Sequence, residues 1–266
     1  MKPIYEEVLK AVKEAGYNAT LKETVKNGVK LCGLNIMDPE SNMAPVIYLD
    51  YLNGNAEEMA QKALEIYEDN RHIAIDVDEF MNREFFEEHI TIALQRKSDE
   101  DLVKKTFLED MEQYLVVMWN ENRIKLRKQT LDYVGLEEDE AWKNAQKNLN
   151  EGTKIISVCQ ALNEMNDFDL PEEIFEDVVP MYVIQANGGI HGASGILNTR
   201  AVAEFAKEHD TNRIIFIPSS VHEGIIIPVD DDSEDIDTIT RFVKETNQEE
   251  VDPIEQLADR AYMIEV

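Results

Sequence analysis

Residues 179–229 read VPMYVIQANGGIHGASGILNTRAVAEFAKEHDTNRIIFIPSSVHEGIIIPV, and this stretch decides the predicted fold. Its apolar start predicts a strand over 179–186. The Asn187-Gly188 pair that follows is typical of a hairpin turn, because both residue types tolerate positive φ. The sequence therefore predicts a return strand over 190–197, so that the two strands form a hairpin.

A helix and a second hairpin follow in the same stretch. The helix is predicted over 201–209, where Val202 and Phe205 recur at helical spacing. The continuous apolar run within 213–218 is typical of a strand buried on both faces. A further strand over 221–229 returns the chain after the two serines. The stretch therefore predicts two hairpins separated by a helix.

Two segments of this stretch carry a resemblance to a known family. They are VPMYVIQANGGIHGASGILN, with His191-Gly192-Ala193, and IIFIPSSVHEGIIIPV, with Pro218-Ser219-Ser220-Val221-His222-Glu223. They resemble the C-terminal region of a bacterial domain-of-unknown-function family common in clostridia, the DUF5688-like proteins. The resemblance covers roughly the last third of the chain. It implies an α+β fold and a bacterial cytoplasmic origin, and it implies no reaction.

Net charge is the most unusual global property of the chain. Its 266 residues include 26 Lys and Arg against 55 Asp and Glu, which gives a formal charge of −29. Residues 1–150 hold 19 against 30, or −11, and residues 151–266 hold 7 against 25, or −18. Such a surface repels nucleic acid and anionic membranes and attracts basic proteins or cations. The alternative that the acidic surface only maintains solubility stays open.

The composition favours a cytoplasmic globular protein. Hydrophobic residues make up 43% of the chain, which is enough for a core. No apolar run approaches the ~20 residues of a membrane helix. The first residues, MKPIYEEVLKAVKEAG, predict an amphipathic helix rather than a signal peptide, because charges interrupt them throughout. Cys32 and Cys159 lie alone in apolar surroundings, which argues against a disulfide framework.

The chain as a whole predicts an α+β fold with a mixed or antiparallel sheet of hairpins covered by helices. We expect a mainly helical N-terminal region, 1–110, and an α+β C-terminal domain, 111–266. The strands of the predicted sheet come largely from 114–127 and 179–229. Asn27-Gly28 predicts a further strand pair within the N-terminal region.

Two charged segments lie N-terminal to residues 179–229. Residues 98–101, Ser-Asp-Glu-Asp, predict a helix start, with acidic residues at the positive end of the helix dipole. Arg123, Lys125 and Arg127 alternate with apolar residues, which predicts a half-exposed strand with one basic face. We expect this face to pair with carboxylates of neighbouring strands rather than to bind nucleic acid.

Ser219, Ser220, His222 and Glu223 are the best cluster of chemically active side chains in the sequence. A hydrolase would use one serine as nucleophile, His222 as its base and Glu223 as the orienting carboxylate. Their spacing argues against this, since neighbouring residues of a strand point to opposite faces. The alternative is a hairpin whose serine hydroxyls bind turn backbone groups, with His222 hydrogen-bonded at the sheet edge.

No metal or cofactor site is predicted. The histidines show no ligand spacing, although His191 and His222 lie in neighbouring predicted strands and could meet, and such a pair would need a third ligand. The glycines at 188, 189, 192 and 195 match no phosphate-loop pattern and favour a turn with a closely packed strand. The acidic run 230–235 lacks the alternation of a calcium loop and is typical of a helix cap, for a helix that ends near Thr246.

Three functions stay open at this point. The first is a protein-binding or regulatory module that uses its acidic surface and has a basic protein as partner. The second is a nucleic-acid mimic that occupies the basic groove of a nuclease or another DNA-binding protein, which requires carboxylates spaced along one face. The third is a hydrolase built on Ser219 or Ser220 with His222 and Glu223. Neither direct nucleic-acid binding nor membrane binding is expected.

Overall fold

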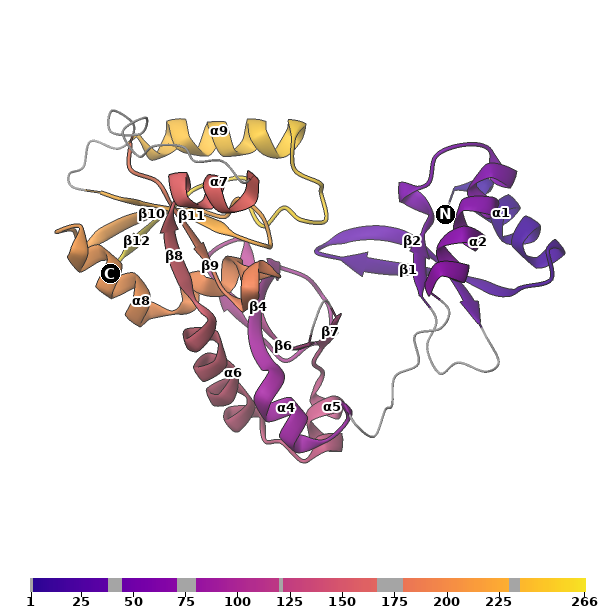
Figure 1. Ribbon diagram of the computed structural model, residues 1–266, viewed down its shortest axis with the longest axis horizontal. Coiled ribbons are helices and arrows are strands. Elements are labelled where there is room, and N and C mark those ends of the chain that lie inside the picture. Colours follow the sequence, from indigo (N-terminus) through magenta and orange to yellow (C-terminus); the bar gives the residue numbers. More distant parts are fainter. Residues whose placement is uncertain (1, 38–44, 71–79, 120–121, 167–178, 230–234) are drawn as a thin grey trace. The chain divides into compact units, whose positions relative to one another are not determined.

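The structure is a computed structural model, and it describes residues 2–37, 45–70, 80–119, 122–166, 179–229 and 235–266. The chain forms two compact units, Met1–Phe80 and Met81–Val266, whose elements are drawn in Figure 1. The division comes earlier than the boundary predicted near residue 110. The reason is that strand β4, Ile90–Arg96, pairs with strand β6, Met111–Trp119, so residues on both sides of 110 share one sheet.

The first unit is an antiparallel sheet packed with helices α1, Pro3–Glu14, and α2, Ala56–Asn70. The strands have the order β1-β2-β3, with bounds Asn18–Lys26, Val29–Met37 and Val46–Tyr48, and the 3₁₀ turn η1 follows at Leu49–Tyr51. The predicted Asn27-Gly28 hairpin turn is confirmed, with φ of 47° and 80°. This unit is therefore α+β in itself, whereas the sequence predicts a mainly helical N-terminal region.

The apolar stripe of α1 explains how this unit closes. Val8 and Val12, one helical turn apart, are fully buried. They share a core with Leu34 and Ile36 of β2 and with Ala63 of α2. Helix and sheet thus bury one apolar face each, which is the ordinary way a small α+β layer forms a core.

The second unit contains two antiparallel sheets. In the first, β6 is the central strand, with β4 along one edge. Strands β5, Lys104–Phe107, and β7, Asn122–Lys125, also pair with β6. Val116 of β6 pairs with both Thr91 of β4 and Lys125 of β7, so β7 lies on the edge opposite to β4.

The second sheet has the order β12-β10-β11-β9-β8. Its strands are β8 (Lys154–Ser157), β9 (Tyr182–Gln185), β10 (Arg213–Ile217), β11 (Gly224–Pro228) and β12 (Tyr262–Glu265). The expectation of one sheet built from 114–127 and 179–229 is therefore wrong. Both edges of β6 are already occupied by its neighbours, so the strands of 179–229 pair with β8 and β12 instead.

Helices pack against both sheets (Figure 1). They are α4 (Arg83–His89), α5 (Lys128–Val134), α6 (Glu138–Gly152), α7 (Val158–Asn166), α8 (Thr199–Glu208) and α9 (Ile236–Glu249). The core under α4, α5 and α6 includes Leu115 and Val117 of β6. A second core joins the sheets, because Leu94 of β4 packs in one cluster with Phe216 of β10 and Phe205 of α8. The predicted α+β fold with antiparallel sheets is confirmed.

The segment after β9 differs from the predicted hairpin. Residues 190–197 form no return strand; the chain turns through the 3₁₀ segments η3, Asn187–Gly189, and η4, Gly192–Leu197. Positive φ at Asn187 (54°) and His191 (52°) breaks the extended conformation at both ends of the expected turn. The small residues instead allow close packing: a Cβ on Gly192 would lie 2.5 Å from the carbonyl oxygen of Ala186.

Among the residues that the structure describes, no helix combines the length and the apolar character that crossing a membrane would require.

Candidate functional site

The Ser219–Glu223 turn connects β10 to β11, and two hydrogen bonds lie within it. Ser220 Oγ accepts a hydrogen bond from the amide of His222 at 3.0 Å. The amide of Ser220 donates to the carbonyl of Glu223 at 3.1 Å. A serine hydroxyl that binds the amide two residues further on is a common way to stabilise a turn. The hydroxyl of Ser220 is therefore used by the turn itself.

His222 is a polar residue of the turn whose side chain contacts two other segments. Its Nδ1 accepts a hydrogen bond from the amide of His191 at 3.4 Å, and its Nε2 lies 3.7 Å from Oε1 of Glu255. The centroids of the two imidazole rings are 5.3 Å apart. The two histidines thus meet in space, but His191 lies in a left-handed turn and not in the predicted strand.

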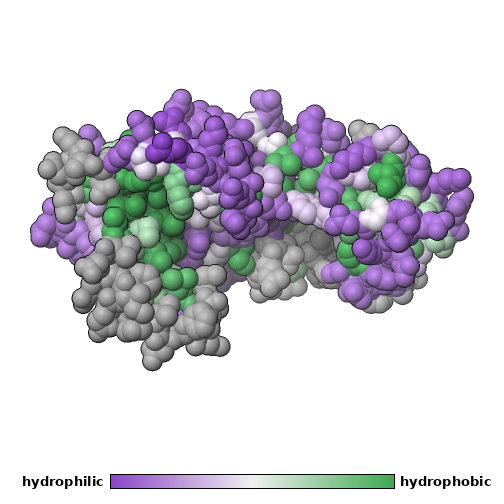
Figure 2. Space-filling model, turned by 90° about the horizontal axis from the view of Figure 1, so that it is seen from above, coloured by the Kyte–Doolittle hydropathy of each residue, from purple (hydrophilic) through white to green (hydrophobic). Residues whose placement is uncertain are grey.

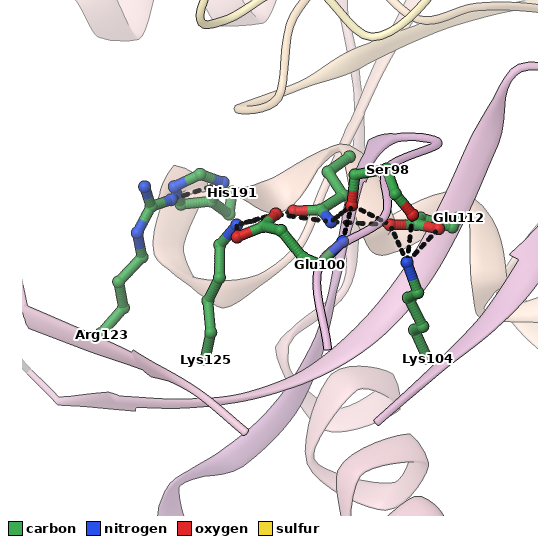
Figure 3. A network of polar contacts seen from close by, with 8 residues as sticks. Ser98, Glu100, Lys104, Glu112, Arg123, Lys125 and His191 are labelled. Carbon is green, nitrogen blue, oxygen red and sulfur yellow. Dashed lines mark hydrogen bonds and ion pairs between the residues drawn. The ribbon is translucent and has the colours of Figure 1, made fainter. Parts of the chain in front are cut away.

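Arg123 of β7 adds a cation to this histidine pair. Its Nη1 lies 3.2 Å from Nδ1 of His191, as Figure 3 shows. A guanidinium group and a backbone amide can only donate hydrogen bonds, so Nδ1 of both His191 and His222 must act as acceptors. In the neutral rings, the remaining proton then lies on Nε2.

The polar face of the four-stranded sheet continues from Arg123 toward β5 (Figure 3). Glu112 of β6 is its most buried carboxylate, and its Oε1 accepts hydrogen bonds from Gln95 Nε2 at 2.7 Å and from Ser98 Oγ at 2.8 Å. The ammonium of Lys104 lies 3.1 Å from Glu112 Oε2 and also donates to the carbonyl of Ser98. The carboxylate is therefore paired and hydrogen-bonded, as burial of a charge requires.

Lys125 of β7 forms the second ion pair of this face. Its Nζ lies 2.7 Å from Glu100 Oε2 and donates to Gln95 Oε1 at 2.8 Å. Gln95 Nε2 in turn donates to Glu100 and to Glu112, so one amide bridges both ion pairs. We call the connected side chains of Gln95, Ser98, Glu100, Lys104, Glu112 and Lys125 the polar network.

Burial and pairing shift the pKa values of these groups. Burial by itself raises the pKa of the Glu112 carboxyl, but hydrogen bonds from Gln95, Ser98 and Lys104 outweigh it and place the pKa below its ordinary value. Burial lowers the pKa of the Lys125 ammonium, and Glu100 opposes this only in part. Burial also raises the pKa of Tyr114, whose ring packs under Lys125, while the charge of Arg123 opposes the rise.

The η3 and η4 segments are tied to the same sheet through Asn187. Thr91 Oγ1 of β4 donates to Asn187 Oδ1 at 2.8 Å, and Asn187 Nδ2 donates to Ser194 Oγ at 3.4 Å. The fully buried Ser194 hydroxyl donates to the carbonyl of His191 at 3.2 Å. This chain of hydrogen bonds fixes the left-handed turn that places His191 on His222.

The sequence matches the model of a family of unknown function (DUF5688) over residues 1–265. The chain belongs to this family. The resemblance carried by the His191-Gly192-Ala193 and Pro218–Glu223 segments is thereby confirmed, and it extends from the last third to essentially the whole chain. No curated protein and no solved structure matches the chain.

In this DUF5688 chain the proposed hydrolase residues do not assemble into a relay. Within the described residues, neither Ser219 nor Ser220 has a hydrogen bond to the ring of His222. The carboxylate beside that ring is Glu255, which is remote in sequence, and not Glu223. A triad requires the serine hydroxyl to face the imidazole, and here the Ser220 hydroxyl faces a backbone amide.

The other candidate sites of the DUF5688 chain are a metal site and the acidic run 230–235. In the described part of the chain, no group of three or more His, Cys, Asp and Glu side chains is arranged to hold a metal ion. Residues 230–234 of the acidic run, and His72, lie outside the described residues. Asp235 caps α9, since its Oδ1 accepts from the amide of Thr238 at 3.2 Å.

Sequence reasoning missed the contacts that join distant segments. The alternation of Arg123 and Lys125 correctly indicated a basic strand face, but their partners are His191 and the loop residue Glu100 rather than neighbouring strands. Residues 98–101, read as a helix start, form a loop whose side chains enter the polar network. The acidic residues of this loop were the signal in the sequence for a partner of Lys125, because a buried lysine needs a paired carboxylate.

Proposed function

We propose that this protein is a cytoplasmic protein-binding module that engages a basic partner through its acidic surface. The observation that carries the proposal is that the cations clustered on the four-stranded sheet are paired within the molecule. Lys104 and Lys125 are paired with Glu112 and Glu100 in the polar network, and their side chains are only 23% and 22% exposed. Arg123 is turned onto His191. Of the three cations of the predicted basic face, Arg123 and Lys125 are thus paired within the molecule, and Arg127 is exposed.

The net charge of the second unit supports the same proposal of a basic partner. Residues 81–266 contain 18 Lys and Arg against 40 Asp and Glu, a formal charge of −22. More of the cations are held in exposed pairs with the unit's own carboxylates: Arg83–Glu87, Lys128–Asp132, Lys147–Glu151, Arg200–Glu204 and Arg260–Glu109. Each such pair contributes only about 0–1 kcal/mol to stability. The excess of carboxylates over cations follows from the composition, and these pairs do not change it.

Figure 2 shows hydrophilic residues over much of the coloured surface, with apolar areas between them. An excess of exposed carboxylates steers a basic protein toward the surface and raises its association rate. The same field repels the phosphates of nucleic acid. This supports a protein partner over direct nucleic-acid binding.

The test is capture of a partner with the tagged full chain from a lysate of the native host, followed by elution with a salt gradient. We expect a basic protein that leaves at moderate salt, because the Debye length falls from about 10 Å at 0.1 M salt to about 3 Å at 1 M. The interaction should reappear with the purified partner and weaken as salt rises. Capture of partners that are not basic, or binding that is insensitive to salt, would contradict the proposal.

The nucleic-acid mimic is a narrower form of the same proposal. It requires that the partner's nucleic-acid groove is the surface that binds this chain. Competition with two DNA duplexes of equal length and charge separates the two: a duplex that fits the partner's groove specifically should displace a mimic more effectively than a scrambled one, whereas a binder of another basic surface should be displaced equally by both.

A further inference from the structure

A groove with a volume of about 730 Å³ lies in the second unit, between α8 on one side and β8 with the start of α7 on the other. The start of β9 also contributes to it. All six residues from Ile155 to Gln160 line the groove, although the side chains of a strand alternate between two faces. The groove therefore follows the main chain of β8 into α7 and does not lie over one face of the strand alone.

The β8 side of the groove combines apolar side chains with the polar residues Ser157 and Gln160. Ile155, Ile156 and Val158 are only partly buried, and Val179 is 48% exposed. These partly exposed side chains offer apolar contact area to a bound segment, next to the charged residues that line the groove.

Three rings meet at the α8 side of the groove. The centroid of Tyr182 lies 4.9 Å from that of Phe205 and 4.8 Å from that of His209, and Phe205 and His209 are 4.5 Å apart. The electron-rich face of a tyrosine ring attracts a cation placed over it, with a gain of about 0.5–2 kcal/mol.

The charged residues that line the groove are carboxylates. Glu204 and Glu208, one helical turn apart on α8, are both exposed, and no Lys or Arg is among the described lining residues. The Glu204 carboxylate is shared with Arg200 at 2.9 Å, in a pair whose side chains are 84% and 61% exposed. Such an exposed pair exchanges easily for another cation, because it contributes little free energy.

We propose that this groove binds a Lys- or Arg-bearing segment of the basic protein partner. The inference rests on the proposed function and names the contact surface within it. Long cationic side chains suit this arrangement because their methylene stems cover apolar surface while the charged head reaches water or a carboxylate. The stems lie on the β8 side, and the heads reach Glu204, Glu208 and the Tyr182 ring.

The experiment uses the full chain and a display library of random eight-residue peptides. Selection against the wild-type chain should enrich peptides that combine Lys or Arg with apolar residues. The affinity of one enriched synthetic peptide is then measured by titration calorimetry. Ala201→Trp fills the groove from α8 and should weaken binding by tenfold or more, a loss that corresponds to 1.4 kcal/mol.

A matched pair of charge variants separates the groove from the general acidic surface. Glu204→Gln/Glu208→Gln removes two charges at the groove, and Glu245→Gln/Glu249→Gln removes two exposed charges from α9. We expect the groove pair to weaken binding at least fivefold and the α9 pair less than twofold. The charge pairs also keep the test decisive if Ala201→Trp fails to fold, which circular dichroism would reveal.

The other outcomes overturn the groove or the function in distinguishable ways. Equal weakening by both charge pairs, with Ala201→Trp unchanged, overturns the groove but leaves the acidic surface in place. Enriched peptides without basic residues overturn both proposals. A wild-type dimer in sedimentation that Ala201→Trp converts to a monomer shows that a second copy of the chain occupies the groove, and this also overturns the inference.

Discussion

The two sheets of the second unit are stabilised by different kinds of interaction. In the five-stranded sheet, successive residues of β10 enter apolar clusters on opposite faces, with Phe216 in one and Ile215 in the other. In the four-stranded sheet, Leu115 of β6 enters an apolar core, whereas Glu112 belongs to the polar network. Apolar burial contributes roughly in proportion to the area removed from water, whereas a polar network depends on every donor and acceptor in it.

The sharpest way to break this comparison is to open the apolar sheet at the interior strand β10. Phe216→Ala removes a ring that is fully buried and is packed against Gly224, so it should lower the free energy of unfolding by about 3–5 kcal/mol. Urea denaturation followed by tryptophan fluorescence measures this unit alone, because both tryptophans, Trp119 and Trp142, lie in it. Phe242→Ala, at a residue that is 66% exposed, is the control and should change the value by less than about 0.5 kcal/mol.

A substitution in the polar network should lower the free energy of unfolding by a smaller amount, because it removes a hydrogen-bond donor rather than buried apolar area. Lys125→Ala removes the ammonium that pairs with Glu100 and donates to Gln95 Oε1, so we expect a loss of about 1–3 kcal/mol in the same denaturation assay. Lys128→Ala is the matched control, since its pair with Asp132 is more than half exposed and should contribute less than about 1 kcal/mol. Equal effects at the two lysines would show that the network adds nothing beyond a surface pair.

Acid should weaken the polar network through Glu112. Its pKa in the folded chain lies below the ordinary value of 4.5, so the unfolded chain binds more protons in this range. The stabilisation is thus fully present above pH 4.5 and is lost as the pH falls through the lower folded-state pKa. Glu112→Gln removes this titration, so its unfolding free energy should fall less steeply with acid than that of the wild type. Parallel curves from pH 6 to pH 3 would contradict the assignment.

The smallest expected effect concerns the histidine pair that adjoins the polar face. His222→Ala removes a long hydrogen bond and a partly exposed contact with Glu255, so it should cost less than about 1 kcal/mol. The same protein tests the hydrolase alternative, with a generic ester as substrate. A serine-dependent esterase activity of the wild type that vanishes in the folded His222→Ala chain would restore that alternative.

The apolar sheet could largely be predicted from the sequence, whereas the candidate site could not. The run Ile214–Ile217 predicted β10 correctly, and helical spacing through Phe205 predicted α8, since each signal is local. The turn at His191 was missed because glycines tolerated in a strand also permit a 3₁₀ segment, and the choice depends on Thr91 and Ser194, which bind Asn187. Glu255 was missed because nothing local links it to His222.

The strand order of the five-stranded sheet has a consequence for synthesis of the chain. Strand β10 pairs with β12, and Phe216 lies opposite Tyr262, so one edge of β10 has no partner until residues 262–265 have left the ribosome. Until then the strand offers Ile-Ile-Phe-Ile with an open row of backbone donors and acceptors, which is the pattern that recruits strands from other chains. Pairing with β12 then closes this edge, so the nascent chain is open to aggregation through β10 only until β12 has emerged.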